Sequence, residues 1–233
     1  RFLYKKFIPD IKKFSDNKYL FLIYFIAHGL TLGFYNAQFY DDIMFYNLDL
    51  HILVQEFKDI GDLFNFRYHL FLFLRNLGPW LVSIMSFLLF FISAMIFKKI
   101  LKSFFNMKKD LIFLFLSLYL VLPFGLIKFT LSVFNYPLCM TFFLIGWYLM
   151  IKSRITSLFF FFISFNMQSL LVLYALPILC YFYYLNPICY NKNSLIQIKK
   201  FIRFSINKLD FFLLPFLFFF IKLSFFKPSG YYK

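Results

Sequence analysis

The chain has 233 residues, of which 62% are hydrophobic, 26% are aromatic and only 15% are charged. A soluble domain carries about 25% charged and about 45–50% apolar residues, so the composition excludes a soluble enzyme, a disordered tail and a coiled coil, and it predicts a polytopic membrane protein. In such a protein the net charge of +15 indicates loops that face the cytoplasm rather than nucleic-acid binding.

The N-terminal part predicts a cytoplasmic segment followed by a first span. Residues 1–18 are basic and lack the apolar core of a signal peptide. Residues 19–40 carry no formal charge apart from His28, which we expect to be a neutral, hydrogen-bonded structural residue. At a rise of about 1.5 Å per residue, about 22 residues cross a hydrocarbon core of about 30 Å. Span 1 should run outward, because its basic flank stays inside.

The loop 41–78 is the net-negative segment of the chain. It holds six of the ten acidic residues: Asp41, Asp42, Asp49, Glu56, Asp59 and Asp62. By the charge rule it faces away from the cytoplasm. Its apolar residues at i, i+3, i+4 and i+7 predict an amphipathic helix lying in the membrane interface: Leu50, Leu53, Val54 and Phe57. A helix that merely covers the bundle would show the same spacing.

Apolar runs separated by basic loops predict the remaining spans. They are 79–97 running inward, 111–127 running outward, 131–150 running inward, and 210–226 running outward. The stretch 155–185 between them has a polar middle at Asn166, Gln168 and Ser169, and it is followed by a basic loop at 186–208. A short helical hairpin keeps that loop in the cytoplasm, whereas one long tilted helix would place it outside.

We therefore expect an all-α fold, a transmembrane helical bundle with about five full spans, a short hairpin and interfacial helices in the first external loop. Residues 1–233 should form a single integral membrane domain. Because the chain begins with Arg1 and stops just after an apolar segment, we also expect a longer protein with a further C-terminal part. The three cysteines form neither a CxxC pair nor a disulfide framework.

Asp41 and Asp42 are the strongest candidates for chemistry, because they directly follow span 1 at the outer water boundary. A carboxylate there can act as a general base toward an acceptor hydroxyl, or it can help to hold a divalent cation. The pair can also simply cap span 1 or solvate the loop. The sequence identifies no metal, and it leaves a divalent cation open as a cofactor.

The order of these parts resembles the GT-C family of lipid-linked-sugar glycosyltransferases. Members have a cytoplasmic N-terminus, a first span, an acidic pair and interfacial helices before span 2. Here the sequence from Asn36 to Asp42 ends in the acidic pair, and Pro79-Trp80 begins span 2. The resemblance implies a polyprenyl-phosphate sugar donor, usually undecaprenyl phosphate in bacteria, a glycan or lipid acceptor, and a location in the inner membrane. It also implies that Asp41 or Asp42 activates the acceptor.

In such a reaction the lipid phosphate is the leaving group, and a cationic side chain must stabilise its negative charge. The candidates on the same side are Arg67, Arg75, Lys128 and Lys227, followed by His69 and His51. Interface anchoring explains Arg75 and Lys227 equally well, and Lys128 can reach the headgroups from the end of its span. Two other functions stay open, a transporter or flippase of lipid-linked glycans and a polysaccharide polymerase. A transporter should place ionisable residues along a path inside its spans, whereas here the acids gather in one external loop.

Overall fold

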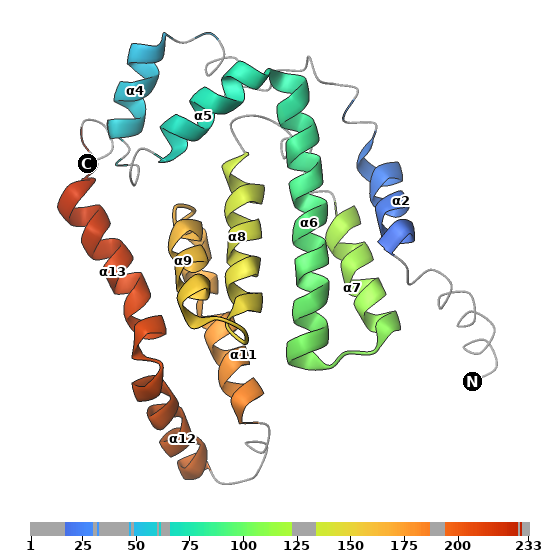
Figure 1. Cartoon of the computed structure of the whole chain (residues 1–233), viewed down its shortest axis with the longest axis vertical. Coiled ribbons are helices and arrows are strands. Elements are labelled where there is room, and N and C mark those ends of the chain that lie inside the picture. The colour runs from blue at the N-terminus through green and yellow to red at the C-terminus, as the bar shows by residue number, and fades with distance from the viewer. Residues whose placement is uncertain are drawn as a thin grey trace. The chain divides into compact units, whose positions relative to one another are not determined.

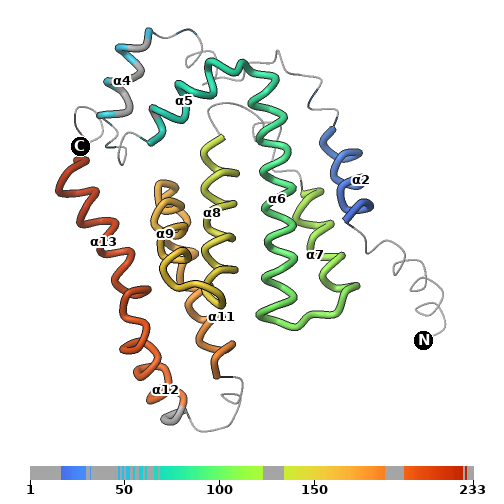
Figure 2. Tube along the Cα trace, viewed as in Figure 1, coloured from blue at the N-terminus to red at the C-terminus, as the bar shows by residue number. Residues whose placement is uncertain are grey.

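The computed structural model describes residues 17–29, 32, 47, 49–59, 61, 66–122, 134–186, 194–227 and 229. Residues 50, 53, 54, 56, 57, 68 and 194–196 are described by their backbone alone. The helices in chain order are α2 Asn17–His28, α4 Leu50–Asp59, α5 Phe66–Leu77, α6 Pro79–Phe105, α7 Lys109–Val121, α8 Asn135–Leu149, α9 Arg154–Ser164, α10 Ser169–Leu173, α11 Ala175–Leu185, α12 Ser194–Asn207 and α13 Leu209–Phe225 (Figures 1 and 2). No described residue belongs to a β-strand, and the all-α prediction is confirmed.

The structure does not confirm five full spans. Among the described helices, only α6 is long and apolar enough to cross a membrane alone, and a second span results if 197–207 and α13 count as one bent helix. A buried helix of a soluble protein passes the same criterion. The other helices that coincide with predicted spans range from α2 with 12 residues to α13 with 17, so they extend about 18–26 Å, less than the hydrocarbon core. The residues over which the sequence extends spans 1 and 3 lie mostly outside the described part.

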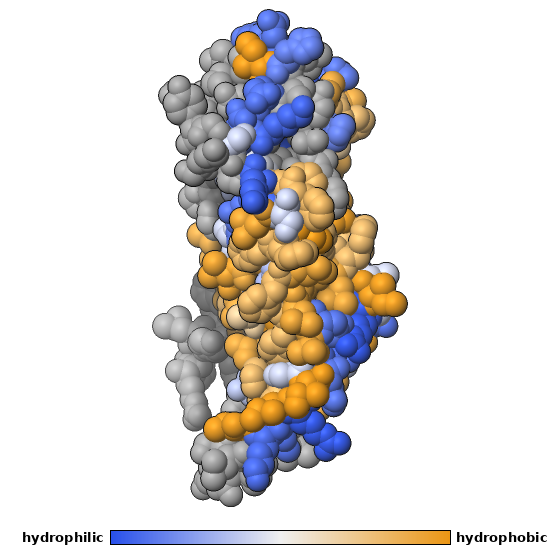
Figure 3. All heavy atoms as spheres, turned by 90° about the vertical axis from the view of Figure 1, so that its left-hand side faces the viewer, coloured by the Kyte–Doolittle hydropathy of each residue, from blue (hydrophilic) through white to orange (hydrophobic). Residues whose placement is uncertain are grey.

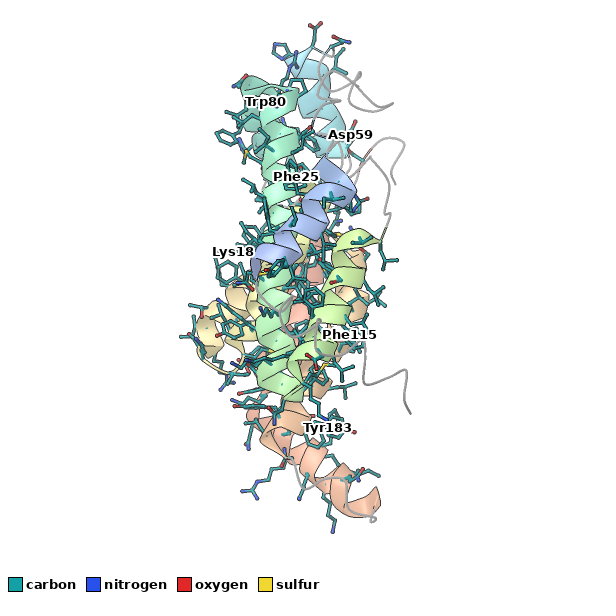
Figure 4. The ribbon with its side chains drawn as sticks, turned by 90° about the vertical axis from the view of Figure 1, so that its right-hand side faces the viewer. Lys18, Phe25, Asp59, Trp80, Phe115 and Tyr183 are labelled. Carbon is teal, nitrogen blue, oxygen red and sulfur yellow. The ribbon has the colours of Figure 1, made fainter. Side chains whose placement is uncertain are left out.

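The chain divides into two units, and the first comprises residues 1–48 and 71–141. In it α7 packs against both α2 and α6. The core of this unit is formed by the buried side chains Leu20, Tyr24, Phe87, Ala94, Leu101, Ile112, Leu116 and Leu120. Tyr24 stacks on Phe87 with ring centroids 4.2 Å apart, and its hydroxyl donates to the Phe87 carbonyl at 3.2 Å. The opposite faces carry exposed rings such as Phe25 and Phe115, labelled in Figure 4.

Polar contacts fix the directions of these three helices. At one end Lys98 Nζ of α6 donates to Asn17 Oδ1 of α2 at 2.6 Å. At the other end of α2, His28 Nε2 lies 2.9 Å from the carbonyl oxygen of Leu120, close to the end of α7. Helix α6 therefore runs antiparallel to α2 and α7, the alternation that the charge pattern predicts for spans 1 to 3. His28 has the structural hydrogen bond expected of it.

Backbone conformation sets both ends of α6. Gly78 precedes the helix with φ 82°, which a side chain would disfavour. Pro79 then occupies the first helical turn, where a missing N–H costs nothing. The helix stops at Asn106, which adopts a left-handed conformation with φ 46°, and Asn tolerates this conformation better than most residues. The turn that follows leads directly to α7.

The second unit comprises residues 49–70 and 142–233. Its 155–185 stretch is divided into α9 and the α10–α11 arm by turns at 165–168. Phe161 and Phe165 of α9 both make edge contacts with Tyr174, at centroid distances of 4.8 and 5.0 Å, so the two arms pack together near the turn. Phe162 and Phe165 in turn contact Phe218 of α13.

The first arm of this hairpin lies tightly against α8. Ser157 Oγ of α9 donates to the Gly146 carbonyl at 2.8 Å. A Cβ atom on Gly146 would stand 3.1 Å from the ring of Phe161, so the absence of a side chain lets the fully buried ring fit. Small residues that permit close helix approach are typical of helix pairs in membranes.

Candidate functional site

One end of the second unit gathers polar groups from segments far apart in the sequence. We call it the polar end and define it by Asp59, Arg67, Asn166, Lys227 and Ser229. Ser229, just beyond α13, donates its hydroxyl to Asp59 Oδ1 at 2.6 Å and its backbone N–H to the Asp59 carbonyl at 2.8 Å. Gln55 Nε2, one turn earlier on α4, donates to the same carboxylate oxygen at 3.0 Å. The Asp59 carboxylate thus joins the end of α4 to the segment after α13.

Arg67 makes the second connection at the polar end. It lies in the first turn of α5, half-buried, and its Nη2 donates to the carbonyl oxygen of Asn166 at 2.9 Å. That carbonyl belongs to the turn between α9 and α10. The Asn166 amide nitrogen donates to the Ile163 carbonyl at 3.2 Å, so its side chain stabilises the end of α9. A guanidinium thus caps the hairpin turn from the side of the acidic loop.

The structure describes some of the predicted site residues and not others. Arg67 and Lys227 both belong to the polar end, and Lys227 is exposed two residues before Ser229. His69 is exposed on α5, two residues after Arg67. Arg75 is half-buried on α5 but belongs to the first unit. Asp41, Asp42 and Lys128 lie outside the described residues, so their predicted roles stay predictions.

Two members of the polar end were not predicted from sequence. The sequence predicts Asp59 only as one acid of the external loop and gives no separate role to Ser229. Their contact joins residues 170 positions apart, and no local pattern signals such a pairing. Asn166, predicted only as part of the polar middle of 155–185, accepts the bond from Arg67 with its backbone carbonyl while its side-chain amide donates to its own helix.

The opposite end of the second unit carries a charged contact of a different kind. Arg154 at the start of α9 forms a bidentate ion pair with Asp210 in the first turn of α13. The hydrogen bonds to this carboxylate raise the pKa of Arg154. Lys208 lies over the ring of Tyr181 at 5.5 Å from its centroid. These contacts hold the starts of α9 and α13 together beside the basic helix α12.

The polar end carries two cations, and its described residues hold no evident metal site. Within the described ranges, no group of three or more His, Cys, Asp and Glu side chains is arranged to hold a metal ion. The divalent cation that the sequence leaves open would therefore need ligands from elsewhere, and Asp41 and Asp42 are not among the residues described. Arg67 and Lys227 supply positive charge that a phosphate group could use.

Comparison with known proteins adds no relative. No protein-family model matches the chain, and neither the curated proteins nor the solved structures contain a significant match.

Proposed function

We propose first that the protein is an integral membrane protein with a cytoplasmic N-terminus. Support comes from the apolar side chains that the second unit leaves uncovered. On α13, Phe216 is 71% and Phe220 is 66% exposed, and large exposed aromatic surfaces are rare on soluble monomers. Figure 3 shows apolar side chains over the middle of α13, with hydrophilic ones toward the α4 end and around α12. Such a band suits a lipid environment.

We propose further that the protein is a membrane glycosyltransferase. It would move a sugar from a polyprenyl-phosphate donor to a cell-surface glycan or lipid at the outer face of a bacterial inner membrane. Asp41 or Asp42 would be the general base. Arg67 and Lys227 would stabilise the departing lipid phosphate, whose negative charge grows as the sugar–phosphate bond breaks.

One observation carries this proposal beyond the acidic pair. The helices of the acidic loop do not stand apart, because α4 is tied to Ser229 and α5 to the hairpin turn. The polar end therefore collects the loop, the turn and the segment after α13 above a group of apolar helices. A donor with a charged phosphate and a long apolar tail needs polar and apolar surfaces joined in this way. A transporter needs instead a polar path within the helices, and the described part of the second unit gathers its charges at its ends.

Cysteine labelling tests the proposed topology. In a variant with Cys139, Cys180 and Cys189 replaced by Ala, a thiol reagent that does not cross membranes should label Lys227→Cys from outside intact cells. Asn193→Cys should react only after the cells are opened, because the basic loop 186–208 is expected inside. Labelling of Asn193→Cys in intact cells, or of both positions equally, would contradict the proposed arrangement.

The sugar-transfer proposal is tested in the cells that make the protein. A deletion strain should lose one sugar from a surface glycan or glycolipid, and the matching polyprenyl-phosphate sugar should accumulate because its consumer is missing. Composition analysis of the envelope glycans and of the extracted lipids measures both. An unchanged glycan composition would reject the transferase. Loss of a whole repeat unit, with the complete lipid-linked repeat accumulating, would favour a flippase or a polymerase.

A further inference from the structure

Helix α12 presents three different faces. One face packs inward, where Phe204 is buried against Phe182 and Tyr181 at centroid distances of 5.3 and 5.9 Å. Phe201 adds an edge contact with Phe182 at 5.2 Å. This face attaches the helix to α11, so the other two faces keep a fixed orientation relative to the second unit.

The second face is an exposed apolar stripe. Ile198, Ile202 and Ile206 follow one another at four-residue spacing and are 54%, 53% and 68% exposed. Side chains four apart lie on one side of a helix, so the three isoleucines form a continuous apolar surface. Exposing such an apolar surface to water would be unfavourable in free energy.

The third face is cationic. Lys199, Lys200 and Arg203 are exposed; Lys199 and Arg203 border the isoleucine stripe, and Lys200 lies beyond them on the side of Phe204. No acidic residue occurs between Ser194 and Leu209, and Asp210 is already engaged by Arg154. No ion pair within the described ranges engages these three cations, so their charge is available there for an anionic partner. An apolar stripe beside a cationic one is the pattern of a helix lying in a membrane interface.

The direction of α12 supports the same arrangement. Residues 197–207 are bent by 61° from α13 at a break beside Lys208. If the 17 residues of α13 cross the bilayer along its normal without 197–207, a helix that leaves α13 at this angle lies closer to the membrane plane than to the normal. The isoleucines can then reach the acyl chains while the cations stay among the headgroups.

We propose that α12 is an interfacial helix that binds the anionic phospholipid headgroups of the inner leaflet. The isoleucine stripe enters the bilayer surface, and Lys199, Lys200 and Arg203 hold the headgroup phosphates. Each cation near an anionic surface strengthens binding by roughly five-fold, so the three together enrich anionic lipid around this helix. This inference rests on the proposed membrane insertion but not on the proposed transfer reaction.

The test measures which lipid surrounds α12 in the full chain. The cysteine-free protein receives Ile202→Cys, is labelled with a fluorescent thiol probe, and is reconstituted into vesicles of seven parts phosphatidylcholine to three parts phosphatidylglycerol. In one set of vesicles the phosphatidylcholine carries bromine, which quenches the probe, and in the other set the phosphatidylglycerol carries it. The total bromine content is the same in both sets. Quenching should be at least about two-fold stronger when phosphatidylglycerol is brominated. The triple variant Lys199→Gln, Lys200→Gln, Arg203→Gln should abolish this preference, whereas Lys102→Gln, Lys108→Gln, Lys109→Gln should keep it.

A probe at Leu88→Cys, an exposed position inside α6, separates the two ways of failing. If the probe at Leu88 is quenched and the probe at Ile202 is not, the protein is inserted and the placement of α12 is wrong. Equal quenching of the probe at position 202 by both brominated lipids shows that α12 lies in the interface without recognising the anionic headgroup. This result also overturns the proposal. If neither probe is quenched, membrane insertion itself fails.

Discussion

Replacing Asp41 or Asp42 by Asn is expected to lower sugar transfer by about 10²–10⁴-fold for the residue that is the general base. Asn keeps the shape of the side chain and can still accept a hydrogen bond, but it cannot take the proton from the acceptor hydroxyl. The second carboxylate of the pair should show a smaller loss, since its role would be to orient the acceptor or to hold a cation. Transfer from a polyprenyl-phosphate sugar in reconstituted vesicles measures the rate.

Asp49→Asn provides the matched control for these variants. Asp49 is exposed directly before α4 in the same acidic loop, so its replacement removes the same charge without touching the pair. Asp49→Asn should transfer sugar at the rate of the unchanged protein, and all three variants should insert into the membrane to the same level. Full activity of both Asp41→Asn and Asp42→Asn would end the general-base proposal. Equal losses in all three variants would point to the charge of the loop as a whole.

The antiparallel alternation of α2, α6 and α7 could be predicted from charge, because each loop's net charge is a local property of the sequence. The basic flanks before residue 19 and after residue 97 place the start of α2 beside the end of α6, and the bond from Lys98 to Asn17 agrees with this. The amphipathic run beginning at Leu50 likewise coincides with α4. In both cases the information lies within a few neighbouring residues.

The polar end could be predicted only in part, because its contacts are made across long sequence separations. Arg67 was a candidate for its charge alone, and nothing near it in the sequence indicates Asn166, 99 positions away. Helix ends were also predicted unevenly, because α6 continues to Phe105 beyond the predicted end at residue 97, whereas α13 has nearly the predicted bounds of 210–226. An apolar run shows where a chain tolerates lipid, but the described helices end where turns and caps stop them, as at Leu122 after α7 and in the turn at 165–168.

The abundance of aromatic residues also makes it difficult to predict from the sequence which side chains are buried. The run from Phe159 to Phe162 consists of four phenylalanines, and hydropathy cannot distinguish them. In the structure Phe161 is fully buried and touches Phe143, Tyr174 and the surface of Gly146. Phe159, two residues earlier on α9, is 59% exposed. Tertiary packing alone assigns one ring to the core and the other to the surface.

Phe161→Ala is therefore expected to cost about 3–5 kcal/mol of stability, because its ring fills the junction of α8, α9 and the α10–α11 arm. In a membrane the stabilising free energy that is lost comes mainly from close packing, because lipid is as apolar as the protein core. Phe159→Ala removes the same atoms from the same helix without opening a cavity and should change stability little. Thermal unfolding of the two purified variants in one detergent measures the difference. Equal losses would mean that α9 does not pack against α8 and the second arm through Phe161, and the hairpin that supports the polar end would then need a different arrangement.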